Sequence, residues 1–180
     1  MGFHPIYKKS AFDLGRHLAN ENISLIYGGG SVGLMGVLAD SVLEHGGEVI
    51  GIIPRFLYEK EVGHDGISEL IIVDSMHERK QKMAELSQGF VAMPGGIGTM
   101  EELFEIFTWA QLALIKKPVA LFDVNHFYKE ILSFLEKMVH EGFIKEMTIK
   151  SLIISHNIHE LIAKMNAFNY SETPKWIDKT

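Results

Sequence analysis

The sequence predicts an α/β protein in which a Rossmann-like, doubly wound parallel sheet lies between two layers of helices. Segments typical of strands and of helices alternate six times along the 180 residues. The apolar strand segments are continuous rather than alternating, which indicates that both faces of the sheet are covered. Two glycine clusters directly follow predicted strands, at the sheet edge where parallel strands end and ligands bind.

A helix opens the chain, because Tyr7, Ala11, Leu14 and Leu18 share one helical face. The first half then continues with these predicted segments, in order: a strand at 23–27, a helix from about 34 to 45 that Gly46-Gly47 stops, a strand at 49–53 that Pro54 ends, a loop with a short helical piece at 54–67, a strand at 70–73 and a charged helix at 76–88.

The second half repeats the same alternation three times, with predicted strands at 89–93, 119–122 and 152–154, each followed by a helix, at 100–114, 127–141 and 158–168. The whole sequence has the length of one domain, so we expect residues 1–180 to form a single Rossmann-like domain. Residues from about 169 to 180 are expected to be a C-terminal tail.

Composition and charge exclude several classes of protein. The sequence contains no cysteine, which rules out disulfides, thiolate nucleophiles and Cys-ligated metals and fits a cytoplasmic location. A formal net charge of −6 argues against a nucleic-acid partner, which would require a basic face. Any anionic ligand must therefore be bound by a local cluster of donors.

One segment has nearly the length of a membrane span. Residues 22–39 carry no charge, but they include five glycines and divide naturally into a strand and a helix. Residues 1–10 lack the apolar core of a signal peptide. We therefore expect no membrane segment.

The first glycine cluster follows the predicted strand at 23–27. Gly28, Gly30 and Gly33 match the Gly-x-Gly-x-x-Gly fingerprint of dinucleotide-binding proteins. The acidic residue that this fingerprint requires at the end of the next strand is absent, and Arg55 stands near that place. An NADP-dependent oxidoreductase is one interpretation of this cluster, and close packing of the helix on the sheet is the other.

The second glycine cluster is Pro94-Gly-Gly-Ile-Gly-Thr-Met-Glu-Glu102. Thr99 and Glu102 have the spacing of a capping box, so Glu102 could serve only to begin a helix. The amides of residues 96–99 would alternatively form an anion site at a helix N-terminus. Two carboxylates beside such a site would repel a phosphate unless cations compensate or the carboxylates point elsewhere. This conflict suggests that the motif has a chemical role, but the motif alone leaves both interpretations open.

Other candidate side chains lie elsewhere in the sequence. Arg79 and Lys80 begin the helix after the strand at 70–73, at the same sheet edge as the glycine clusters; alone, such a pair is usually a solvated face. His156 and His159 have metal-like spacing, but no third ligand is near in the sequence, so surface histidines and no metal are expected. Thr108 and Gln111 are polar residues on a largely apolar helix and could face a ligand or water.

The glycine motif together with Met76-His-Glu-Arg-Lys80 resembles the LOG (Lonely Guy) family of cytokinin riboside 5′-monophosphate phosphoribohydrolases, formerly labelled possible lysine decarboxylases. The family pattern Pro-Gly-Gly-x-Gly-Thr-x-x-Glu is filled at every position from Pro94 to Glu102. The resemblance runs from about Pro5 to Ile144 and includes Tyr27 to Gly36, Thr108 to Leu112, Lys116 to Pro118 and Glu141 to Ile144.

This resemblance implies hydrolysis of the N-glycosidic bond of a nucleoside 5′-monophosphate, with AMP or an N6-modified AMP such as isopentenyl-AMP as substrate and no cofactor. It places the catalytic pair at Arg79 and Glu102. The substrate-binding residues that we predict are Gly29, Gly30, Glu61, Arg79, Lys80, Gly95, Gly96, Ile97, Gly98, Thr99, Met100, Glu101, Glu102 and Thr108. A nucleotide-binding module or sensor without hydrolysis is the alternative.

The resemblance also implies a homodimer whose active site lies near the subunit interface. The helix that carries Phe104, Phe107, Trp109 and Leu112 supports a dimer independently, because it is apolar on more than one face. Two features depart from the family. A further strand and a Gly-Ser loop usually precede the equivalent of Pro5, and this sequence has Ala113-Leu-Ile115 where the family tends to have Gly-Ile-His.

Overall fold

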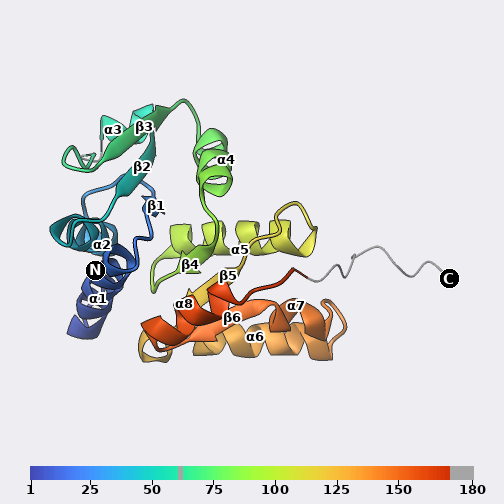
Figure 1. The fold of residues 1–180 in the computed structure, drawn as a ribbon. Helices are drawn as coiled ribbons and strands as arrows, with labels where there is room; N and C mark the ends of the chain where they lie inside the picture. The colour runs from blue at the N-terminus through green and yellow to red at the C-terminus, as the bar shows by residue number, and fades with distance from the viewer. Residues whose placement is uncertain (61–62, 171–180) are drawn as a thin grey trace. The chain divides into compact units, whose positions relative to one another are not determined.

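The computed structural model describes residues 1–60 and 63–170. The chain divides into two compact units, Met1–Ser87 and Gln88–Thr180. Each unit contains its own three-stranded parallel sheet, ordered β1-β2-β3 in the first and β4-β5-β6 in the second. The prediction of parallel strands in an α/β fold is confirmed, and the six strands form two sheets of three (Figure 1).

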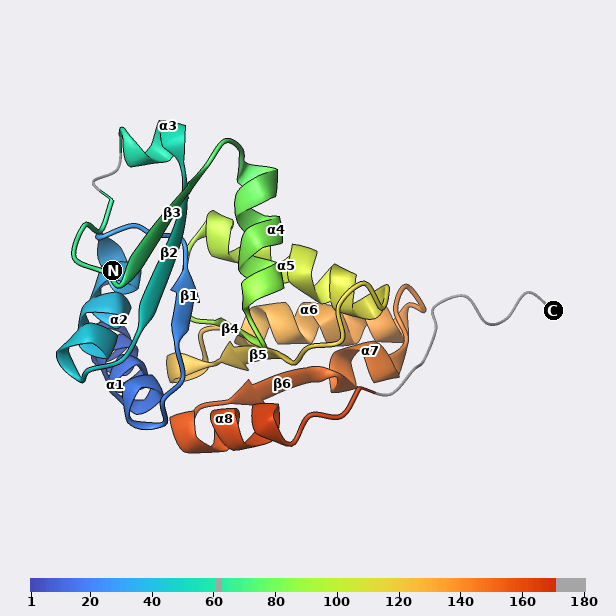
Figure 2. The ribbon, with the colours of Figure 1, turned by 45° about the horizontal axis from the view of Figure 1, so that its top comes forward.

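The first unit contains these elements, in order: α1 (Pro5–Asn20), β1 (Leu25–Tyr27), α2 (Gly33–Glu44), β2 (Val49–Pro54), α3 (Arg55–Tyr58), β3 (Glu69–Val73) and α4 (Met76–Leu86). Helices α1 and α2 pack against each other, and Figure 2 shows them on one side of the sheet with α4 on the other. Both faces of this sheet are therefore covered, which explains why β2 is apolar and buried along most of its length.

The second unit contains these elements, in order: β4 (Phe90–Ala92), α5 (Ile97–Gln111), β5 (Val119–Phe122), the 3₁₀ helix η1 (Val124–His126), α6 (Lys129–His140), α7 (Glu146–Lys150), β6 (Leu152–Ser155) and α8 (Ile158–Asn166). Its main core joins one face of the sheet to α5 and α6 through these buried residues: Leu103, Phe107, Val119, Leu121, Tyr128, Leu135 and Leu152. Helix α8 contacts β5 and β6 and covers the sheet on the other side (Figure 2).

Most predicted elements lie within a few residues of their observed bounds, and two differences matter for the site. Helix α5 begins at Ile97, three residues before the predicted start. The segment predicted as one helix at 127–141 is preceded by η1, in which Asn125 and His126 both have positive φ angles. Helix α7 was not predicted, because five residues are too few to establish a helical period.

No helix in the described ranges combines the length and the apolar character that crossing a membrane requires. Residues 22–39, which suggested such a span by length alone, contain β1, the glycine loop and part of α2. Glycines interrupt the segment at the point where the strand turns into the helix. The rejection of a membrane helix at this place is therefore confirmed.

Candidate active site

The first glycine cluster forms the turn from β1 to α2. Gly29 has a φ of +77° and Gly33 a φ of +72°, a left-handed conformation that glycine adopts without strain. A side chain at Gly36 would overlap the carbonyl oxygen of Ser31, so this glycine lets the first turn of α2 close onto the loop. These three positions are explained by the local fold alone.

Gly28 has a different role, because its neighbour is a side chain from another element. A Cβ atom at this position would overlap Nη2 of Arg79 and lie 3.0 Å from Cζ. The Arg79 guanidinium therefore lies directly against the backbone at the carboxyl end of β1, and only 8% of the residue is exposed. The structure thus brings together two features that the sequence placed at one sheet edge.

The start of α4 is fixed by a cap that involves Ser75 and Glu78. The Ser75 hydroxyl accepts a hydrogen bond from the Glu78 amide at 3.1 Å, and the Glu78 carboxylate accepts one from the Asp74 amide at 2.9 Å. This arrangement resembles the reciprocal bonds of a capping box. It holds the first turn of α4 and thereby positions Arg79, which follows Glu78 directly.

The second glycine cluster forms the turn from β4 into α5, and the interpretation of Thr99 and Glu102 as a capping box is wrong. The N-cap of α5 is Gly96, and among the described residues no side-chain capping bond forms at this N-cap. Thr99 is consequently the third residue of the helix, with its side chain folded over Gly95. Glu102 is the sixth residue, beyond the position from which a glutamate bonds back to the N-cap.

Space is open above the first turn of α5. A Cβ atom at Gly96 or Gly98 would meet nothing within 4 Å, and neither residue has a positive φ. Neither glycine is therefore required by the conformation of the chain. The amides of Ile97, Gly98 and Thr99 precede the first intrahelical bond, which the Met100 amide donates to Gly96. Exposed glycines at uncapped amides allow close approach of an anion.

Tyr128 supports the backbone that leads into this turn. Its hydroxyl donates to the Met93 carbonyl at 2.6 Å, and its amide donates to the Asp123 carboxylate at 2.8 Å. Tyr128 is fully buried, and burial raises the pKa of its hydroxyl, with the nearby Asp123 carboxylate as a second cause. The sequence analysis missed this residue, because its partner lies 35 positions away and no local pattern marks the contact.

The remaining predicted site residues differ in exposure and in hydrogen bonding. Lys80 and Glu102 are half-buried, and Glu101 is exposed. The Thr108 hydroxyl donates to the Phe104 carbonyl one turn earlier at 2.6 Å. Glu61 lies outside the described residues. Arg79 and Lys80 belong to the first unit, whereas residues 94–102 and Thr108 belong to the second.

A cavity of about 1050 Å³ lies in the second unit, away from the glycine motif. It opens near the amino ends of β5 and β6, because the first residues of both strands, Val119 and Leu152, line it. The motif instead follows the carboxyl end of β4. The cavity therefore contributes nothing to the candidate site.

The chain is similar in sequence to one family of known proteins. The family model described as "Possible lysine decarboxylase" matches residues 35–165. The cytokinin riboside 5′-monophosphate phosphoribohydrolase LOG5 of Arabidopsis thaliana is 44% identical over 167 residues, which are 93% of this chain and 73% of that protein. The probable enzyme LOGL2 of rice, Oryza sativa subsp. japonica, is 43% identical over 168 residues, 93% of this chain and 69% of that protein.

Solved structures show the same fold at lower identity. The molybdenum cofactor carrier protein of Chlamydomonas reinhardtii matches with a TM-score of 0.67 at 22% identity, covering 89% of this chain and 86% of that one. The X-ray structure of TM1055 matches with a TM-score of 0.68 at 19% identity and covers 92% of both chains. The fold is therefore the Rossmann-like one that the sequence predicts. The family match and the relatives above 40% identity together show that the chain belongs to the LOG family.

Proposed function

We propose that this chain hydrolyses the N-glycosidic bond of a nucleoside 5′-monophosphate and releases the free base and ribose 5-phosphate. Its relatives are named cytokinin riboside 5′-monophosphate phosphoribohydrolases. The observation that carries the proposal is the first turn of α5. Open space at Gly96 and Gly98 adjoins helix amides that precede the first intrahelical bond, and Glu102 follows in the next turn. AMP and an N6-modified AMP such as isopentenyl-AMP are the proposed substrates.

The two chemical parts of this turn suit the two parts of such a substrate. Amides at a helix N-terminus bind phosphate, and the helix dipole adds to the attraction. Loss of the base builds positive charge on the ribose, as it does in other glycoside hydrolyses. A carboxylate at Glu102 would stabilise that charge and could position or deprotonate the attacking water. Neither part requires a cofactor.

Arg79 is proposed as the second catalytic residue. Its guanidinium is buried and lies against Gly28 at the carboxyl end of β1, so the backbone fixes its position before a ligand arrives. A fixed guanidinium is suited to charge-assisted, bidentate hydrogen bonds with phosphate or carboxylate oxygens. Lys80, Glu61, Thr108 and the loop residues Gly29 and Gly30 are proposed as further substrate contacts. A cytoplasmic homodimer, with the active site near its interface, completes the proposal.

Release of free base tests the proposal directly. The purified chain is incubated with AMP, with isopentenyl-AMP and, as a control without phosphate, with adenosine, and the bases are separated by chromatography. We expect base from at least one monophosphate and none from adenosine. If no purine or pyrimidine monophosphate yields base, hydrolysis is refuted. Thermal stabilisation by a nucleotide that is recovered unchanged would instead indicate a binding module or sensor.

A further inference from the structure

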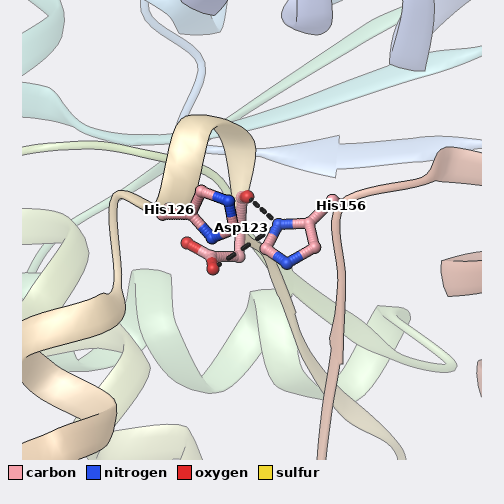
Figure 3. A group of neighbouring side chains, drawn as sticks. All are labelled: Asp123, His126 and His156. Carbon is pink, nitrogen blue, oxygen red and sulfur yellow. Dashed lines mark hydrogen bonds and ion pairs between the residues drawn. The ribbon is translucent and has the colours of Figure 1, made fainter.

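Asp123, His126 and His156 form a cluster at the carboxyl ends of β5 and β6, and we propose that it binds a divalent transition-metal ion, with Zn²⁺ as the ion we expect (Figure 3). Each side chain offers a ligand atom, and these atoms all lie within 4.8 Å of one another. All three residues belong to the second unit. The proposal is independent of the proposed hydrolysis.

The register of the sheet brings two of these residues together. Phe122 pairs with Ser155 at the ends of the parallel strands β5 and β6, and Asp123 and His156 are the next residue of each. The Asp123 amide also donates to the Ser155 carbonyl at 3.0 Å, which extends the pairing to this point. Because two ligands follow directly from paired strands, their backbones are fixed before any ion binds.

The hydrogen bonds leave suitable ligand atoms available. Nδ1 of His156 lies 2.5 Å from the Asp123 carbonyl oxygen, to which it donates, so Nε2 carries the lone pair. A ring N–H bonded to a backbone carbonyl is the usual way in which proteins orient a metal-binding histidine. Oδ1 of the buried Asp123 accepts the Tyr128 amide, and Oδ2 lies on the histidine side, 3.6 Å from Nδ1 of His156.

His126 is presented in a strained conformation. Asn125 and His126 have φ angles of 55° and 56°, a left-handed conformation that residues other than glycine adopt rarely. This turn places the His126 ring 4.5 Å from the His156 ring, between their centroids, and beside the Asp123 carboxylate (Figure 3).

The donor set selects the class of ion. Two imidazole nitrogens and one carboxylate oxygen suit Zn²⁺ and neighbouring transition metals, whereas Mg²⁺ and Ca²⁺ prefer oxygen ligands alone. Zn–N and Zn–O distances of about 2.0–2.2 Å require the ligand atoms to draw closer than 4.8 Å. His126 and His156 are exposed, so rotation of their side chains can supply that movement. Three protein ligands leave a coordination position for water.

Zinc titration of the full chain, without a histidine tag and after treatment with EDTA, tests the proposal. We expect one Zn²⁺ per chain, bound tightly enough to compete with a chelator of micromolar affinity, and no binding of Mg²⁺. His156→Ala and His126→Gly should each weaken zinc binding by about tenfold or more. Glycine is chosen at position 126 because it tolerates the positive φ. Asp123→Asn should also weaken binding while its side-chain oxygen still accepts the Tyr128 amide.

His159→Ala is the matched control, because His159 is exposed, lies three residues after His156 and is outside the cluster. Its zinc affinity should equal that of the unaltered chain, and circular dichroism should show every variant folded. Failure of the unaltered chain to bind zinc would mean that the cluster is only an ion pair and would overturn the proposal. The proposal would also be overturned if His159→Ala weakened zinc binding while His126→Gly and His156→Ala left it unchanged.

Discussion

Glu102 lies in the second turn of α5, where its carboxylate is too far along the helix to cap it. Glutamine has the size of glutamate and can still accept a hydrogen bond, so Glu102→Gln should leave the free energy of unfolding within about 0.5 kcal/mol of its original value. Turnover of AMP or isopentenyl-AMP should fall roughly 10²-fold or more in Glu102→Gln, because the amide cannot stabilise a ribosyl cation or act as a base. Nucleotide affinity should be kept or increase, since repulsion of the phosphate is relieved.

Three measurements check this prediction: base release, denaturant unfolding and calorimetric binding of AMP. Glu136→Gln is the control, because Glu136 is an exposed carboxylate of α6 away from the motif. It should match the unaltered chain in all three measurements. A folded and fully active Glu102→Gln protein would show that the carboxylate has no catalytic role.

Gly28 tests the position of Arg79 without removing the guanidinium. In Gly28→Ala the new methyl group would overlap Nη2, so the Arg79 side chain must move away from the end of β1. If this position is the catalytic one, turnover should fall by about tenfold or more, because a displacement near 1 Å is costly for positioned groups. Arg79→Ala should lose both nucleotide binding and turnover.

Gly66→Ala is the matched glycine control in the same unit. Its added methyl group would lie no closer than 3.6 Å to His64, and its φ is not positive. Base release and nucleotide affinity should therefore stay unchanged. Equal loss of activity in both alanine variants would indicate a general loss of stability rather than displacement of Arg79, and unfolding curves separate the two cases.

At the scale of elements, Tyr128 connects the start of α6 to the end of β4 and thereby supports the turn into α5. Its hydroxyl donates to the Met93 carbonyl at 2.6 Å. Tyr128→Phe leaves that carbonyl without this partner, so the free energy of unfolding should fall by about 1–3 kcal/mol. Tyr27, at the end of β1, has a buried hydroxyl with no hydrogen-bond partner in the described part of the chain.

Tyr27→Phe is therefore the matched comparison for Tyr128→Phe. It removes a hydroxyl that has no hydrogen-bond partner among the described residues, so the free energy of unfolding should change by less than about 1 kcal/mol. Urea denaturation of both variants measures the difference. If Tyr27→Phe were the more destabilising variant, the hydrogen bonds assigned to these two tyrosines would be wrong.

The raised pKa of Tyr27 leads to a prediction of how the free energy of unfolding depends on pH in the alkaline range. Burial, and to a smaller extent the Asp40 carboxylate, raises the pKa of Tyr27 from 10.0 to about 12. The folded chain then holds this proton at pH values where the unfolded chain releases it, so the free energy of unfolding should decline between pH 10 and 12. Tyr27→Phe should decline less steeply over that interval. Urea denaturation on both sides of pH 10 measures this, and identical slopes would contradict the assignment.

At the scale of the whole molecule, we expect a homodimer with twice the 20.3 kDa mass of one chain. Helix α5 supports this expectation, because Phe104 remains 37% exposed although Phe107 of the same helix is buried. Light scattering measures the mass. Phe104→Asp should shift the protein toward monomer, whereas Phe134→Asp, which changes an exposed phenylalanine of α6, should not. A single-chain mass for the unaltered protein would refute the dimer.

The sequence by itself determined the features that depend on local pattern. Apolar runs and helical spacing predicted the order of the major strands and helices. A buried face requires apolar residues that recur every few positions in the sequence, and this repeat is visible without the structure. Glycine clusters after β1 and before α5 marked the turns at the carboxyl ends of strands. Positive φ angles explain the glycines at positions 29 and 33, whereas Gly96 and Gly98 have no positive φ. The family followed from the same motifs.

Only the tertiary structure decided which distant segments contact each other and which of two identical local patterns forms the expected hydrogen bonds. Ser75 with Glu78 and Thr99 with Glu102 share one spacing, yet only the first pair caps a helix, because Gly96 already begins α5. The packing of Arg79 on Gly28 joins residues that are about fifty positions apart in the sequence.

The cluster at the ends of β5 and β6 was likewise beyond local analysis. Spacing in the sequence paired His156 with His159, whereas the sheet register pairs it with Asp123, 33 positions away, and the left-handed turn adds His126. A parallel strand pair brings its carboxyl ends together whatever lies in the connection between them. No local period records which distant strand becomes the neighbour, so such a site is decided by the fold.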